Sequence, residues 1–233
     1  MRPSALLIVG EKKILIDIGP DFRQQALSCS LNGLDGVVLT HAHSDHVAGL
    51  DDLRVFYLMN QRKVPCLLSE ETLRELQQRF YYLFKPQDSS SVRKGNLMAK
   101  IDFQVLEKSR GETKFSDVPV KYFTYSQGPM SVNGYRFGNL AYVTDICDYP
   151  ESIFEDLNGV KTLVLSAPQY ESSYVHFGVD EAIAFSRKLG VEKTYLMHIS
   201  HKIDHEEGSL YLPSDVFLGY DGLELEFQID EQG

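Results

Sequence analysis

The sequence predicts an α/β fold in which β-sheets are covered by helices. Short apolar runs alternate with stretches of helical spacing through both halves of the chain, as expected where strands and helices interleave. The chain has 233 residues, enough to bury one substantial core. Hydrophobic residues make up 43% and charged residues 24%, close to the globular average. We therefore expect residues 1–233 to form a single domain.

Three strands and a helix are expected before residue 41. Residues 4–9 and 13–17 are β-like runs separated by a turn at Gly10, which fits a hairpin. Asp21 is placed to cap the helix that follows it. Residues 36–40 form a compact apolar strand that leads directly into a histidine-rich segment.

Helical spacing predicts two helices in the next part of the chain. They cover residues 49–59 and 69–84, and Ser69 is suited to cap the second. Residues 64–68 between them read as a strand. Residues 86–95 are polar and include three consecutive serines, so we expect a mobile loop there.

The second half alternates between strands and helices. Alternation and frequent glycines from residue 101 to 137 indicate several antiparallel strands. The remaining expected elements are strands over residues 140–144, 162–165, 194–197 and 216–227, and helices over residues 150–157 and 179–189.

The segment from His41 to His46 reads H-x-H-x-D-H. With His43 and Asp45 it places four candidate ligands within six residues, although the chain has only seven histidines. Histidine nitrogens and an aspartate oxygen suit zinc, manganese or iron. The alternative is a solvated polar loop without a metal. Packing four such groups together without a cation would crowd costly polar atoms, so a metal site is favoured.

Two further candidates lie far along the chain. Asp145 and His198 each follow a short apolar strand directly, as His41 does. If the three strands lie side by side, their ends open on one rim, where ligands of open sheets gather. The alternatives are that Asp145 caps a turn and that His198 is a core histidine.

This pattern resembles the metallo-β-lactamase superfamily over nearly the whole chain. The resemblance is closest to the branch of the cyclic-phosphate phosphodiesterases and PqqB-like proteins, and more distant to tRNase Z. The matching stretches are Leu15–Gln25, Thr40–His46, Gly49–Arg54, Val143–Asp145 and His198–His201. The fold that the resemblance implies is an αββα sandwich.

The resemblance also implies one or two divalent ions, zinc or manganese. The implied ligands are His41 and His43 for one ion, Asp45, His46 and His198 for a second, and Asp145 as a bridge between them. Asp17 would orient a ligand histidine; the alternative is a turn-forming aspartate.

His176 precedes Glu181-Ala182 as in the branch's H-x4-E-A pattern. It is similar to the histidine thought to contact the phosphate or to protonate the leaving group. The alternative is a surface histidine. His201 and His205 are expected to be exposed or to support the ligands from outside.

The sequence departs from the family in two places. Where the family has a third histidine for the first ion, within H-G-x-M-x-V-x-G-Y-R, this chain has Gln127. An amide oxygen is a poorer donor to zinc than imidazole, so we expect Gln127 to leave the first site weak, selective for manganese or empty. The chain also enters near the family's second strand, so either the sandwich lacks its first strand or the protein starts upstream.

The implied activity is hydrolysis of a small phosphodiester or cyclic phosphate by metal-activated water. Asp45 would accept a proton from the water, and His176 would serve the leaving oxygen as a general acid. One alternative is a metal-depleted, non-catalytic binding module of the same fold, motivated by Gln127. The other is a tRNase Z-like nuclease.

Charge and cysteine usage set the expected setting. A net charge of -10 argues against gripping a long nucleic acid but permits a small anionic substrate. No apolar run is long enough to span a membrane. The three cysteines, Cys29, Cys66 and Cys147, are widely spaced and odd in number, which favours a cytoplasmic protein without disulfides. A homodimer is compatible with this interpretation.

Overall fold

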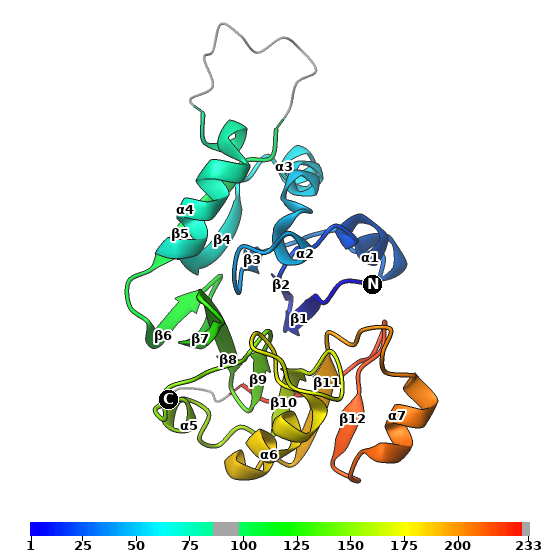
Figure 1. The fold of residues 1–233 in the computed structure, drawn as a ribbon. Helices are drawn as coiled ribbons and strands as arrows, with labels where there is room; N and C mark the ends of the chain where they lie inside the picture. The colour runs from blue at the N-terminus through cyan, green and yellow to red at the C-terminus, as the bar shows by residue number, and fades with distance from the viewer. Residues whose placement is uncertain (86–97, 230–233) are drawn as a thin grey trace, which may run out of the picture. The chain divides into compact units, whose positions relative to one another are not determined.

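The computed structural model describes residues 1–85 and 98–229 and contains two compact units, Met1–Glu107 and Lys108–Gly233 (Figure 1). Each unit has one β-sheet with helices packed on it. The loop predicted at residues 86–95 lies outside the described residues. Within the described part of the chain, no helix has the length and apolar character needed to cross a bilayer.

The first unit is built on a five-stranded sheet in the order β1-β2-β3-β4-β5. The strands are β1 (Ala5–Val9), β2 (Lys12–Ile16), β3 (Gly36–Val38), β4 (Val64–Ser69) and β5 (Ile101–Leu106). β1 and β2 form the predicted antiparallel hairpin, and each later pair is parallel. The expectation of antiparallel strands from residue 101 is therefore wrong for β5, because its partner is β4 in this sheet.

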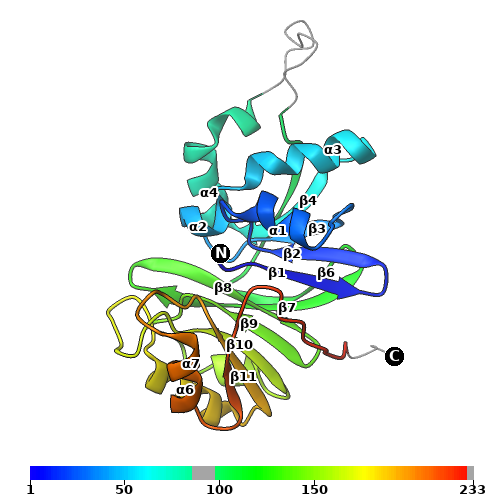
Figure 2. The same ribbon diagram turned by 90° about the vertical axis from the view of Figure 1, so that its right-hand side faces the viewer.

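Helices of the first unit lie on one face of its sheet (Figure 2). They are α1 (Phe22–Ser28), α2 (Ser44–Val47), η1 (Leu50–Leu53), α3 (Arg54–Asn60), α4 (Glu70–Arg79) and η2 (Tyr81–Phe84). Ser69 caps α4 as predicted, because its hydroxyl accepts the Thr72 N–H at 3.2 Å. Asp21 does not cap α1: its carboxylate accepts the backbone N–H of Arg2 instead.

The second unit is built on a seven-stranded sheet in the order β12-β11-β10-β9-β8-β7-β6. Its strands are β6 (Arg110–Phe115), β7 (Val118–Gln127), β8 (Met130–Phe137), β9 (Leu140–Val143), β10 (Thr162–Ser166), β11 (Lys193–Met197) and β12 (Val216–Leu218). β6 to β8 pair antiparallel, as predicted. β9 also pairs antiparallel with β8, and β9 to β12 pair parallel. The strand predicted over residues 216–227 is shorter than expected.

The described part of the second unit has three helices. They are α5 (Ile153–Asp156), α6 (Val179–Leu189) and α7 (His205–Tyr211). α6 has the predicted bounds and buries Val179, Ala182 and Phe185 in the core of this unit. α7 is not anticipated by the sequence reasoning. Asp204 starts it by accepting the N–H groups of the next turn.

The parallel strands position the candidate ligands of the second unit. Asp145 and His198 follow β9 and β11, which flank β10, so both residues lie at the carboxyl edge of the same sheet. The expectation that β3 lies beside these strands is wrong, because β3 belongs to the five-stranded sheet. His41 is therefore brought to its position by a different sheet.

Candidate metal centre

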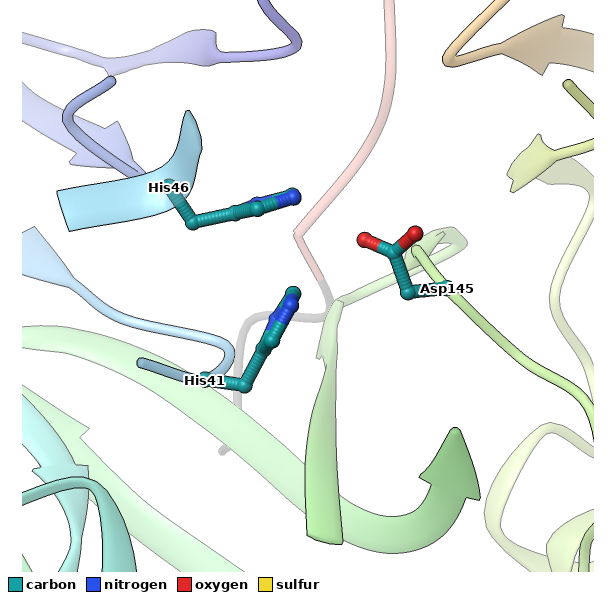
Figure 3. A group of neighbouring side chains, drawn as sticks. All are labelled: His41, His46 and Asp145. Atoms are coloured by element: carbon teal, nitrogen blue, oxygen red, sulfur yellow. The ribbon is translucent and has the colours of Figure 1, made fainter. Parts of the chain in front are cut away.

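In the first unit, the H-x-H-x-D-H segment leaves β3 and turns into α2. His43 precedes α2, and Asp45 and His46 lie within it. The His41 and His46 side chains are buried, and their ring centroids lie 4.2 Å apart (Figure 3). Arg79, in the last turn of α4, donates a hydrogen bond to the Ala42 carbonyl oxygen and so fastens the segment to that helix.

Asp17 contacts the segment from Thr40 to His46 and holds it in place. Its buried carboxylate accepts hydrogen bonds from the Thr40 N–H at 2.8 Å, the Thr40 hydroxyl at 2.8 Å and His46 Nδ1 at 2.7 Å. The bond to Nδ1 fixes the ring and its tautomer, which leaves Nε2 as the nitrogen suited to a metal. Asp17 therefore holds the ring of His46, a predicted ligand, through a hydrogen bond.

Close backbone packing holds Asp17 against α2. Ile18 N–H donates to the His46 carbonyl at 2.8 Å, and Gly49 N–H donates to the Ile18 carbonyl at 2.9 Å. A Cβ on Gly19 would lie 2.2 Å from the Asp45 carbonyl oxygen, so only glycine fits there. Gly19 and Gly49 thus let the two backbone segments lie in contact.

Interatomic distances in the first unit fit metal ligation. His41 Nε2 lies 3.0 Å from His43 Nδ1, and His46 Nε2 lies 3.6 Å from Asp45 Oδ2. Two ligand atoms on one tetrahedral zinc are about 3.3 Å apart. The His41–His43 contact also has the length of a hydrogen bond, so the distance alone does not identify an ion. The four side chains, three imidazoles and one carboxylate, are of the types that bind a divalent ion.

In the second unit, the Asp145 carboxylate is surrounded by nitrogen atoms. Oδ1 lies 3.4 Å from His198 Nε2, 3.2 Å from His176 Nδ1 and 3.3 Å from Gln127 Nε2. Oδ2 accepts the Thr144 hydroxyl at 3.0 Å. A buried carboxylate beside an imidazole is a donor pair that a divalent ion can use.

Three of these candidate residues occupy the left-handed backbone region. Asp17, Asp145 and His198 have φ values of 58°, 53° and 61°, each just beyond the end of a strand. Such conformations cost about 1–3 kcal/mol and persist where the surroundings enforce them, often at functional sites. For Asp145 the enforcing contact is its own N–H, which donates to the buried hydroxyl of Ser166 at 2.6 Å.

His176 and Gln127 contact each other near Asp145. His176 Nε2 and Gln127 Nε2 are 3.1 Å apart, and the His176 side chain is 21% exposed. His176 is therefore partly buried and in contact with two other candidate side chains. His201 and His205 are exposed, as expected.

Sequence reasoning missed the hydroxyl groups that contact the predicted ligands. Thr40 and Thr144 directly precede His41 and Asp145, and Ser166 ends the strand between those that carry Asp145 and His198. A polar residue at the end of an apolar strand, next to a ligand, was the available signal. Cys66, on β4, is a structural neighbour: burial, and secondarily the charge of Asp17, raises the pKa of its thiol.

Comparisons with known proteins identify the fold. Residues 12–199 match the family described as the beta-lactamase superfamily domain. The crystal structure of a diphosphatase from the PhnP family is 32% identical, with 98% of this chain and 85% of that chain covered and a TM-score of 0.86. Zinc-bound PqqB from Methylobacterium extorquens shares the fold at 17% identity, with 96% and 87% covered and a TM-score of 0.71. The predicted sandwich class and branch are confirmed.

A curated relative is longer than this chain. An octanoyltransferase of Porphyromonas gingivalis is 33% identical over 238 residues, which cover 100% of this chain and 46% of that protein. The chain thus spans about half the length of this relative, and the transferase name belongs to the longer protein.

Proposed function

We propose that this chain, which belongs to the metallo-β-lactamase superfamily, is a metal-dependent hydrolase that cleaves small phosphodiesters or cyclic phosphates. The proposal rests on two groups of potential metal-ligand atoms, one in each unit, that follow the ends of strands. The first unit supplies imidazole and carboxylate atoms at ligand-like separations, and one imidazole is oriented by Asp17. The second unit supplies Asp145 with an imidazole beside it.

The proposed ligands are those of the sequence prediction. They are His41, His43, Asp45, His46, Asp145 and His198, and they would hold one or two divalent ions, zinc or manganese. When bound, such ions activate water as a nucleophile and neutralise charge that builds on a phosphate. A similar solved structure is named a diphosphatase, which supports a phosphate-containing substrate but does not itself point to a phosphodiester bond.

Asp45 and His176 are proposed to move protons. The Asp45 side chain is 32% exposed, so its carboxylate can accept a proton from an attacking water. His176 is proposed to protonate the leaving oxygen. Since both of its ring nitrogens lie close to side chains of the second unit, the ring must turn toward the substrate to do so.

Metal content and turnover test the proposal. Elemental mass spectrometry of the purified protein should detect bound zinc or manganese. It should hydrolyse bis-p-nitrophenyl phosphate, a 2',3'-cyclic nucleotide or a nucleoside diphosphate sugar. His46→Ala should lose both properties, and His205→Ala, which removes an exposed histidine, should keep them. Turnover equal in wild type and His46→Ala would remove the proposal.

The role of His176 has its own test. General acid catalysis contributes about 10²–10⁴-fold, and only where the leaving group needs a proton. His176→Ala should therefore slow hydrolysis of an alkyl phosphodiester strongly and of a p-nitrophenyl ester little. An equal loss on both substrates would assign His176 to binding or positioning instead.

Gln127 supports one competing function, a metal-depleted binding module of the same fold. Absence of any bound ion, together with absence of turnover, would favour it. A tRNase Z-like nuclease is disfavoured by the net charge of -10, and retention of tRNA at physiological salt would revive it. Octanoyl transfer would have to be shown for this chain alone, since it matches 46% of the transferase.

The proposal also covers the cellular compartment and the binding partner. The three cysteines are free thiols, which is the state expected in the cytoplasm. We propose a cytoplasmic enzyme whose partner is a small anionic substrate.

A further inference from the structure

Gln127 ends β7 at the position where the resemblance places an imidazole for the first ion. Its side chain is 5% exposed, and its Nε2 lies 3.3 Å from Asp145 Oδ1 and 3.1 Å from His176 Nε2. The amide therefore touches a proposed ligand directly. The question is which end of the amide it presents.

Hydrogen-bond chemistry decides the orientation. A carboxylate oxygen accepts hydrogen bonds and cannot donate them, so the amide end that faces Asp145 Oδ1 is the NH₂ group. Reversing the amide would place two acceptor oxygens against each other. The carbonyl oxygen of Gln127 is buried and accepts no hydrogen bond from the described residues. The atom that could ligate a cation thus points away from Asp145.

The same amide sets the ring of His176. An NH₂ group only donates, so His176 Nε2 must accept. The ring proton is then on Nδ1, which lies 3.2 Å from Asp145 Oδ1. One side chain therefore holds both the carboxylate and the imidazole through its two N–H groups.

We propose that Gln127 is a positioning residue and not a metal ligand, and that the chain holds one divalent ion tightly. The one-ion part rests on the proposed function, because it assumes that the ligand set binds metal. In the ligand set that the resemblance implies, the first ion would need a nitrogen lone pair at the position of Gln127. Gln127 presents N–H hydrogen atoms there instead, so the first ion keeps only His41 and His43 as imidazole ligands.

Metal stoichiometry after dialysis against buffered zinc or manganese tests the one-ion part. We expect one ion per chain in the wild type, two in Gln127→His, and one in Gln127→Ala with affinity about 10–100-fold weaker, as for lost support of a ligand. Two ions in the wild type would overturn the proposal. So would complete loss of the ion in Gln127→Ala, or an unchanged single ion in Gln127→His.

Nuclear magnetic resonance of the metal-free protein tests the positioning part without any metal. We expect a slowly exchanging side-chain NH₂ pair that disappears in Gln127→Ala, and a His176 ring with its proton on Nδ1 in the wild type only. A proton on Nε2 in the wild type would overturn the proposal. If no variant binds metal, the proposed function fails, and this spectrum still decides the role of Gln127.

Asn133 provides the matched control. It is another buried amide of the same sheet, 1% exposed, and its Nδ2 donates to the Thr124 hydroxyl at 3.0 Å. Asn133→Ala should change neither the ion count nor the His176 tautomer. A change equal to that of Gln127→Ala would show that any lost buried amide disturbs this sheet, and would overturn the specific role.

Discussion

Asp17→Asn should weaken both folding and metal binding. The carboxylate of Asp17 accepts three hydrogen bonds, and its Oδ2 alone accepts two, from the Thr40 hydroxyl and from His46 Nδ1. An asparagine keeps one oxygen, so its NH₂ group must oppose at least one former donor. Asparagine also tolerates the positive φ of 58°, so the substitution separates hydrogen bonding from backbone strain.

The magnitude follows from these contacts. A hydrogen bond to a charged group contributes about 1.5–3 kcal/mol, and a buried donor left without a partner costs about 1–3 kcal/mol. We therefore expect the free energy of unfolding of the metal-free protein to fall by about 2–4 kcal/mol. Metal affinity should fall about 10–100-fold, because His46 loses the group that orients it.

Urea unfolding in the presence of a chelator measures the first effect, and competition with a chromophoric chelator measures the second. Asp35→Asn is the control. Asp35 is a partly buried aspartate of the same unit whose carboxylate accepts the Lys13 N–H at 2.9 Å, away from the ligand loop. An Asp17→Asn protein as stable as Asp35→Asn, with wild-type metal affinity, would refute the role given to Asp17.

Three further predictions concern a buried thiol, a helix cap and a close-packed glycine. Burial raises the pKa of Cys66, so this thiol should stay protonated and unreactive toward a disulfide reagent at pH 8, while exposed Cys29 reacts; rapid labelling of Cys66 in the folded protein would contradict this. The pKa of Cys66 in the folded state lies above the ordinary pKa of a cysteine thiol. Ionisation of this thiol therefore lowers the free energy of unfolding only once the pH rises above the ordinary thiol pKa. Ser69→Ala should lower the free energy of unfolding by about 1 kcal/mol and Ser69→Asp should not, since aspartate also caps; equal effects in urea unfolding would exclude the cap. Gly134→Ala should cost about 1–3 kcal/mol, because its Cβ would lie 2.4 Å from a phenylalanine ring, whereas Gly33→Ala meets nothing within 4 Å and should be tolerated.

The elements with strong local signals could be predicted from the sequence. The hairpin, the cap at Ser69 and the bounds of α6 depend on residues close together in the chain, and all are as expected. The partnership of β4 with β5 could not be predicted. The two strands are separated by more than thirty residues, and nothing local to β5 distinguishes a parallel partner from an antiparallel one.

The candidate site divides in the same way. Spacing alone predicted the cluster from His41 to His46, and strand ends predicted Asp145 and His198. The orientation of Gln127 could not be predicted, because the composition of a side chain does not say which end of its amide meets a neighbour. The cap expected at Asp21 failed for a related reason: a distant backbone N–H, that of Arg2, competes for the same carboxylate.

Ser166→Ala tests whether the protein itself holds the proposed bridging carboxylate in place. Ser166 is buried at the end of β10, and its hydroxyl accepts the Asp145 N–H at 2.6 Å. Alanine would leave that N–H without its acceptor in a strained turn, at a cost of about 1–3 kcal/mol in the free energy of unfolding. The affinity for zinc should fall as well, because Asp145 would lose its fixed backbone conformation.

Ser186→Ala is the control for Ser166→Ala. Ser186 is equally buried, but its hydroxyl donates to the Ile183 carbonyl within α6, so its loss leaves no N–H group without a partner. We expect a change below about 1 kcal/mol and unchanged zinc affinity. If the two serine variants behave alike, the turn at Asp145 does not depend on Ser166. If only Ser166→Ala weakens zinc binding, the carboxylate is held ready before any ion arrives, and the strain at φ 53° is part of how the chain builds its metal centre.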